Sequence, residues 1–188
     1  DAVLYGKGVG AESPLSSDRW GAEESRAPAA MNNPADGLKT DPFLRLGERI
    51  FAAGDTARVL DLLQRRPNRL PLWPLAGEQG LVAGHNMAVL AANRPESFLR
   101  RYPGGIAGNS FSLFGLDFIS TGFRTLPEKS DVWRTEVEKK DGAYRRLNFA
   151  GEKLKGFILA GRKNILEAGP LRAAVQRNAL TDYQTRDL

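Results

Sequence analysis

The spacing of apolar and polar residues changes along this chain and divides it into three stretches. Residues Ala11 to Asp36 are polar, rich in Ser, Ala, Pro, Asn and Glu, and show no periodic apolar positions. Such a composition is typical of a long loop. Short apolar runs separated by proline and glycine follow as far as Asn109. From Ser110 onward apolar positions tend to alternate with polar ones, which indicates strands.

The middle stretch contains one predicted strand and one predicted helix. The apolar run Arg49 to Asp55 predicts a strand that ends in the dipeptide Gly54-Asp55. Residues Thr56 to Leu63 are expected to be helical or to form an extended loop. The block that begins at Leu72-Trp73 predicts a helix from Pro74 to Ala88, because proline is well tolerated in the first turn of a helix.

The last stretch predicts antiparallel strands and one helix. The dipeptide Asp141-Gly142 is a strong signal for a two-residue hairpin turn. A helix is expected to begin at Asn164 or at Pro170 and to end near Asn178. Strands followed by one helix predict a compact α+β unit. The predicted strands are Phe111–Gly122, Val132–Glu138, Tyr144–Phe149 and Leu154–Ala160.

The dipeptide Gly54-Asp55 and the helix that begins at Pro74 together indicate a cofactor site. A strand that closes on Gly-Asp releases its backbone at the edge of a sheet where α/β folds bind ligands. Gly54 lets the main chain approach a ligand closely, and Asp55 can accept hydrogen bonds from ligand hydroxyls. The N–H groups at the start of the helix would face the same crevice. Alternatively, Asp55 is a solvent-facing turn residue.

Composition narrows the classes of function. The net charge of +5 comes with isolated basic pairs, which favours solvated surface charge over nucleic-acid binding and leaves room for an acidic partner. The chain has no cysteine, which excludes disulfides and thiolate chemistry here and fits a cytoplasmic location. No apolar run is long enough for a membrane span. The single histidine, His85, has no partner motif, so neither a catalytic residue nor a metal ligand is predicted.

Three segments resemble one known family, the FAD-dependent pyridine nucleotide-disulfide oxidoreductases. They are IFAAGD at residues 50–55, WPLAGEQGLVAGHNMA at residues 73–88 and LFGLDFISTG at residues 113–122. The branch of NADH–rubredoxin reductases, nitrite reductase large subunits and ferredoxin reductases is the most similar. In that family the aspartate of the first motif binds the ribityl chain of FAD, and the start of the following helix lies under the pyrimidine end of the flavin.

The resemblance assigns a set of residues to cofactor binding. The helix start would supply backbone groups, and Trp73 would line the pocket or stabilise the loop in the core. Gln79 would either contact the pocket or face solvent one turn into the helix. No residue of the chain is assigned a catalytic role. The residues implied to bind FAD are Gly54, Asp55, Trp73, Pro74, Leu75, Ala76 and Gln79.

The resemblance also implies a domain organisation. Residues 1–109 would be the C-terminal, α/β part of an FAD-binding domain, with residues 11–36 as a long polar loop and Gly37–Asp41 as a strand beside the one that ends at Asp55. Residues 110–188 would form an α+β C-terminal domain with an antiparallel sheet. Neither Gly-x-Gly-x-x-Gly loop of the family is present, and members have about twice this length, so the chain resembles their C-terminal half.

The resemblance implies that this chain is part of a longer protein, the full-length parent, and that the parent is a flavoenzyme. The parent would pass electrons from NAD(P)H through FAD to a small, acidic electron-carrier protein or to another domain. The isolated chain would bind FAD weakly or not at all. It would pair with the missing N-terminal half, or self-associate through exposed Leu72, Trp73 and Leu75. The alternative is a non-catalytic interaction domain, or one subunit of a split flavoprotein that is inactive alone.

Overall fold

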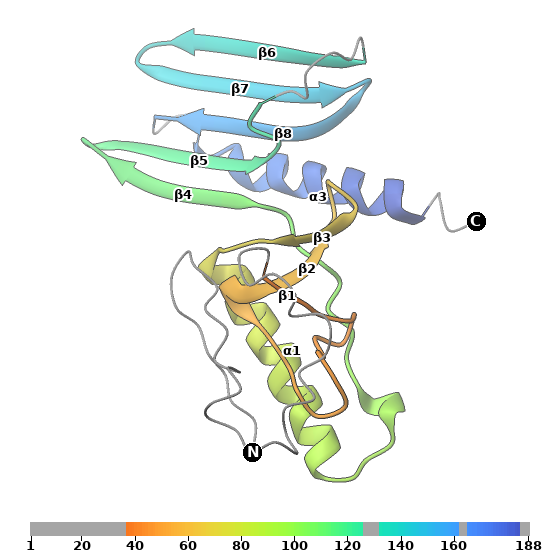
Figure 1. Ribbon diagram of the computed structural model, residues 1–188. Coiled ribbons are helices and arrows are strands. Elements are labelled where there is room, and N and C mark those ends of the chain that lie inside the picture. The colour runs from red at the N-terminus through yellow and green to blue at the C-terminus, as the bar shows by residue number, and fades with distance from the viewer. Residues whose placement is uncertain (1–36, 126–131, 162–164, 185–188) are drawn as a thin grey trace. The chain divides into compact units, whose positions relative to one another are not determined.

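The computed structural model describes residues 37–125, 132–161 and 165–184, so the polar stretch 11–36 and Asn164 lie outside the described residues (Figure 1). The chain forms two compact units. The described part of the first unit comprises residues 37–61 and Arg66–Gly105. The second unit comprises Leu62–Arg65 and the chain from Ile106 onward.

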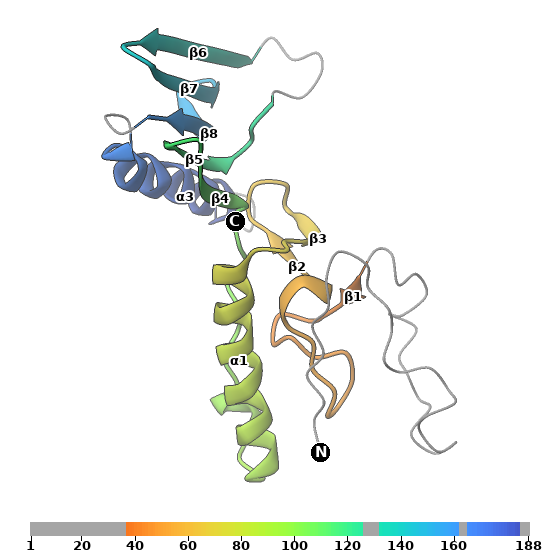
Figure 2. The ribbon, with the colours of Figure 1, turned by 90° about the vertical axis from the view of Figure 1, so that its left-hand side faces the viewer.

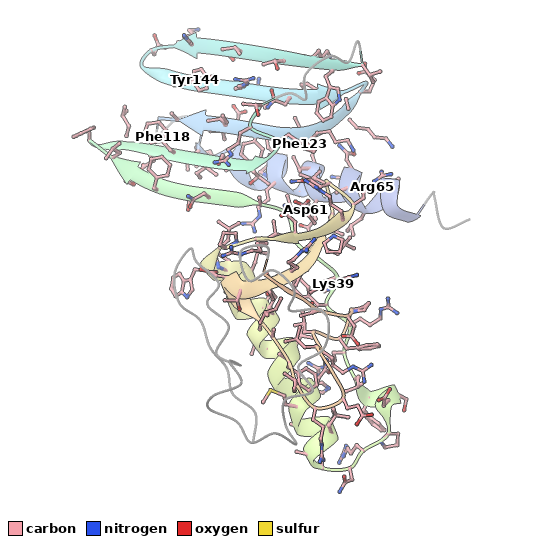
Figure 3. The ribbon with its side chains drawn as sticks, viewed as in Figure 1. Lys39, Asp61, Arg65, Phe118, Phe123 and Tyr144 are labelled. Atoms are coloured by element: carbon pink, nitrogen blue, oxygen red, sulfur yellow. The ribbon has the colours of Figure 1, made fainter. Side chains whose placement is uncertain are left out.

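The first unit contains a small mixed sheet. Strand β2 (Ala57–Asp61) lies in the middle, with β1 (Leu38–Lys39) parallel to it on one side and β3 (Arg66–Arg69) antiparallel on the other. Alternate residues of β2 are buried, which is the burial pattern of a strand with one face on the core. Figure 3 labels Lys39 on β1 and Asp61 at the end of β2.

The position of the strand next to Gly54-Asp55 differs from the prediction. No strand leads directly into the dipeptide: between β1 and Gly54 the described chain has only an isolated bridge between Phe51 and Arg45. Gly54–Thr56 forms one turn of 3-10 helix, η3, and β2 follows it where a helix or loop was expected. Residues 41–52 instead form a compact turn, in which the Asp41 carboxylate accepts bonds from the main-chain N–H groups of Phe43 (2.8 Å) and Arg45 (2.9 Å).

The predicted helix is confirmed as α1 (Trp73–Ala91), with Pro74 in its first turn. Its buried residues recur every three or four positions, which is the spacing of one helix face. A short 3-10 helix, η4 (Glu96–Phe98), follows α1 and contacts it. One face of α1 therefore packs on the core of the first unit. The buried residues of α1 are Leu75, Gln79, Ala83, Asn86 and Val89.

The second unit is an antiparallel five-stranded sheet with one helix. The strands are β4 (Gly108–Leu113), β5 (Leu116–Gly122), β6 (Trp133–Lys140), β7 (Ala143–Ala150) and β8 (Lys153–Ala160), in the spatial order β4-β5-β8-β7-β6. Helix α3 (Ala168–Gln184) lies against one face, next to β8 and β5 (Figure 2). The buried core cluster is Leu147, Leu154, Phe157, Leu159 and Val175.

Several predictions for this unit are confirmed and two are corrected. Strands β6, β7 and β8 lie where they were expected, and Asp141-Gly142 forms the hairpin turn. The predicted single strand at residues 111–122 is in fact two strands joined by a turn at Phe114-Gly115. The sequence did not indicate this turn, because phenylalanine is apolar and is not a typical turn residue. Helix α3 begins at Ala168, between the two predicted starts, and continues past Asn178.

Aromatic pairs occur along the second sheet. The rings of Phe111 on β4 and Phe118 on β5 stack with centroids 5.0 Å apart. Figure 3 labels Phe118 on β5. Phe123, just after β5, packs edge-to-face against Trp133 at 5.3 Å. Such contacts add to the stability that burial of the rings provides. The sheet thus has a side-chain network beyond the core cluster.

Candidate functional site

The Gly54–Thr56 turn lies directly against the start of α1. Gly54 has a φ of +82°, a conformation that side chains with a Cβ rarely adopt. A Cβ at Gly54 would lie 3.6 Å from the Cβ of Ala76 in the first turn of the helix. The two sequence blocks that predicted a common site are therefore neighbours in the fold.

A hydrogen bond joins the two blocks. The main-chain N–H of Gly54 donates to Oε1 of Gln79 over 2.8 Å. Gln79 is fully buried, with 0% of its surface exposed. The alternative that Gln79 faces solvent is therefore wrong, because its side chain points inward to the Gly54 main chain. Gln79 connects the turn to the second turn of α1.

Asp55 offers a free carboxylate beside this link. Its side chain is half-buried and has no hydrogen-bond or ion-pair partner among the residues that the structure describes. Its main-chain oxygen accepts a bond from Nε of Arg69 over 3.0 Å, which fixes the backbone of the turn. A carboxylate with unused lone pairs on a fixed backbone is well suited to accept hydrogen bonds from ligand hydroxyls.

The start of α1 offers unpaired donors. Leu72 precedes the helix without a side-chain cap, and no acidic residue lies in the first turn. The N–H groups of Trp73 and Leu75 have no acceptor within the helix, and Pro74 has no N–H group. The helix dipole adds partial positive charge at this end. Electronegative ligand atoms would therefore be favoured at the start of α1.

The apolar residues at this helix start differ in exposure. Trp73 is 90% exposed, which agrees with the expected exposure and rules out the alternative that it stabilises the loop in the core, whereas Leu75 is only 6% exposed. The expectation that Leu75 lies on the surface is wrong, because its side chain lies against Gly105 within the first unit, where a Cβ on the glycine would be 3.0 Å from Cδ1 of Leu75. Only the backbone of Leu75, and not its side chain, is thus available to a ligand.

Tyr102 is a neighbour of this site that the sequence did not indicate. Its residue is 7% exposed, and its hydroxyl has no hydrogen-bond partner in the described chain. Burial raises the pKa of Tyr102; the nearby Gln79 amide opposes this shift and the Glu78 carboxylate adds to it. The phenol therefore stays neutral at physiological pH. No sequence motif marks Tyr102, because its proximity to Gln79 arises only from the fold.

Other classes of site find no support in the described residues. They contain no group of three or more His, Cys, Asp or Glu side chains that could hold a metal ion. Nε2 of His85 lies 3.0 Å from the main-chain oxygen of Phe98, which is a structural contact. None of the described helices has the length and apolar content needed to cross a bilayer.

The chain has the fold of part of the FAD-dependent pyridine nucleotide-disulfide oxidoreductases. A crystal structure of such an enzyme from Desulfovibrio vulgaris matches it with a TM-score of 0.60 and 20% identity, over 78% of this chain and 36% of that chain. The water-forming NADH oxidase from Lactobacillus brevis, bound to NADH, matches with a TM-score of 0.59 and 20% identity, over 78% and 34% of the two chains.

The NADH:rubredoxin oxidoreductase from Clostridium acetobutylicum matches with a TM-score of 0.55 and 18% identity, over 80% of this chain and 34% of that chain. No protein-family model matches the sequence, and no curated protein matches it. The resemblance predicted from the sequence is thereby confirmed at the level of the fold. The match spans about a third of the length of these enzymes, where half was expected.

Proposed function

We propose that this chain supplies the C-terminal part of the FAD site in an FAD-dependent NAD(P)H oxidoreductase. The observation that supports this most directly is the bond from Gly54 to Gln79, which holds the turn that carries Asp55 against the uncapped start of α1. A carboxylate can accept hydrogen bonds from the ribityl hydroxyls of a flavin nucleotide, and N–H groups at a helix start can donate to the oxygen and nitrogen atoms of its ring. The two kinds of group present in this chain therefore fit the two polar parts of the cofactor.

The residues have separate roles in this proposal. Asp55 accepts hydrogen bonds from the ribityl chain, and Gly54 allows the main chain to approach the cofactor. The N–H groups of Trp73 and Leu75 favour electronegative atoms at the pyrimidine end of the ring, while the N–H of Ala76 already donates to the main-chain oxygen of Leu72 over 2.9 Å, so that Ala76 contributes through its place in the first turn. Pro74 fixes the backbone angle at the helix start. FAD, when bound, would supply the redox chemistry, and the protein would supply orientation and electrostatics.

The wider function follows from the same proposal. NAD(P)H is the reductant, and a small acidic electron-carrier protein or another domain is the acceptor, which the net charge of +5 would attract. Nucleotide-binding portions like those of the matched enzymes would complete the FAD and NAD(P)H sites. The proposed location is the cytoplasm.

A second candidate role is that of a non-catalytic association domain. It is favoured by exposed apolar side chains on the β4–β5 hairpin, where Phe111 is 53% and Phe114 is 94% exposed. Visible absorbance of the purified protein distinguishes the roles, because a flavin spectrum supports the first. Colourless protein that gains no spectrum on addition of FAD, even with all coding sequence upstream of Asp1 included, supports the second.

The substitution Asp55→Ala tests the flavin proposal. We expect FAD affinity to fall about tenfold or more, because a hydrogen bond to a charged group contributes about 1.5–3 kcal/mol. Affinity is measured by flavin fluorescence titration in protein that includes any upstream coding sequence. Glu48→Ala removes an exposed carboxylate elsewhere and should leave the affinity unchanged. Equal affinities of wild type and Asp55→Ala would show that Asp55 is only a turn residue.

A further inference from the structure

Helix α1 buries two amide side chains completely, and they differ in how they are satisfied. Asn86 is 0% exposed, and its Nδ2 donates to the main-chain oxygens of Phe43 (3.0 Å) and Arg100 (2.9 Å). Its Oδ1 accepts from the N–H of Arg100 over 2.7 Å. Gln79 is also 0% exposed, but only its Oε1 is bonded, while Nε2 has no partner in the described chain.

The orientation of the Gln79 amide is set by Gly54. A flipped amide would place its NH2 group against the Gly54 N–H, so that two donors would face each other. Nε2 therefore has to face away from Gly54. The Gln79 amide is close enough to the Tyr102 hydroxyl to oppose the burial-driven rise in the pKa of the phenol, but neither Nε2 nor the hydroxyl has a partner with the distance and angle of a hydrogen bond within the described residues.

A buried donor without a partner lowers the free energy of unfolding, so the Nε2 group of Gln79 destabilises the fold. An apolar side chain of the same length would remove that unsatisfied donor. It would also leave the N–H of Gly54 without its acceptor. Among the described residues, the one side-chain hydrogen bond that Gln79 makes is thus the bond to Gly54, in contrast to the fully bonded side chain of Asn86.

We propose that Gln79 is a positioning residue that acts through Gly54 and does not itself touch the cofactor. Oε1 fixes the main chain of Gly54 relative to α1, and Gly54 in turn determines where Asp55 presents its carboxylate. The turn and the helix start would then move as one body. The link from Gln79 to Gly54 is a property of the chain alone, while its effect on a ligand rests on the proposed FAD site.

The experiment compares three variants of the full chain by amide exchange measured with NMR, and compares their FAD affinity by titration in protein that includes any upstream coding sequence. Gln79→Met keeps the length of the side chain but removes the strong acceptor, so the Gly54 amide should exchange at least about tenfold faster and FAD should bind at least about fivefold more weakly. Gln79→Glu keeps an acceptor oxygen and should restore protection of Gly54. Tyr102→Phe removes the neighbouring unpartnered hydroxyl and should change neither quantity.

The amide of Ala52 is the internal control, because it donates to the main-chain oxygen of Leu44 over 3.0 Å, independently of Gln79. The protection of the Ala52 amide should be the same in all variants. If Gln79→Met lowers it, Gln79→Glu is compared with wild type instead: kept protection of Gly54 in Gln79→Glu supports the proposal, and loss of Gly54 protection with Ala52 still protected overturns it. Unchanged exchange at Gly54 in Gln79→Met would overturn the proposal, and weaker FAD binding with unchanged exchange would show direct contact instead. Faster exchange in protein that never binds FAD, even with all upstream coding sequence included, supports the positioning link and overturns the FAD site.

Discussion

Phe114 occupies a backbone conformation that phenylalanine rarely adopts. Phe114 and Gly115 have φ angles of 52° and 75°, almost identical to the 51° and 74° of Asp141 and Gly142 in the other two-residue turn. Aspartate tolerates this left-handed conformation through local hydrogen bonds, whereas a bulky side chain is strained in it. The Phe114 side chain is 94% exposed, so no packing within the described chain offsets the strain.

Replacement of Phe114 by asparagine should therefore stabilise the protein. Asn-Gly is the preferred sequence for this turn type, and we expect Phe114→Asn to raise the free energy of unfolding by about 1 kcal/mol. Urea denaturation followed by circular dichroism measures the change. Asp141→Asn, at the same position of the other turn, is the matched control and should have little effect. A loss of stability in Phe114→Asn would mean that the phenylalanine side chain makes a contact worth more than the strain.

At the scale of elements, β5 and β8 approach so closely that only glycine fits. Gly122 and Gly156 are paired across the two strands. A Cβ on Gly156 would lie 2.2 Å from the main-chain oxygen and 2.4 Å from the nitrogen of Phe123. Backbone atoms cannot move aside as a flexible side chain can. The end of β5 can therefore lie directly against β8 only because residue 156 is glycine and has no side chain.

Gly156→Ala should accordingly destabilise the second unit. Overpacking of this kind costs about 3 kcal/mol, and thermal unfolding followed by circular dichroism should show the loss. Gly84→Ala in α1 provides the contrast, because no atom lies within 4 Å of a Cβ there. That substitution should stabilise the protein by up to about 1 kcal/mol, since alanine favours a helix over glycine. A tolerated alanine at position 156 would contradict the close approach of the two strands.

At the scale of the whole molecule, the division into two units predicts independent folding. The core cluster around Phe157 and Val175 lies entirely within the second unit, with Leu63 from the β2–β3 loop packed against it. We expect residues 106–188 produced alone to fold, with slowly exchanging amides in β7 and β8. NMR amide exchange is the direct measurement. Exchange as fast as in an unstructured peptide would contradict independent folding of residues 106–188. The substitution Leu63→Ala in the full chain would then measure how much stability the β2–β3 loop contributes to the second unit.

The sequence alone determined the features that depend on neighbours along the chain. Helix α1 follows from Pro74 and the apolar spacing after it, the turn at Asp141-Gly142 follows from its dipeptide, and β6 to β8 follow from the strand-like pattern around that turn. The motif at residues 50–55, with the one at residues 73–88, was enough to indicate the family whose fold the chain shares in part. Each signal lies within a few residues, because helices and hairpins are stabilised by local bonds.

Only the tertiary structure decided the features that join distant residues. Strand β2 was missed because five residues that include Arg58 and Asp61 carry a weak apolar pattern, and pairing with β1 and β3 makes them a strand. Gln79 is polar and near a helix start, so only its bond to Gly54, 25 residues away, shows that it is buried. Burial and hydrogen bonding at such separations depend on how the whole chain packs, which no local pattern records.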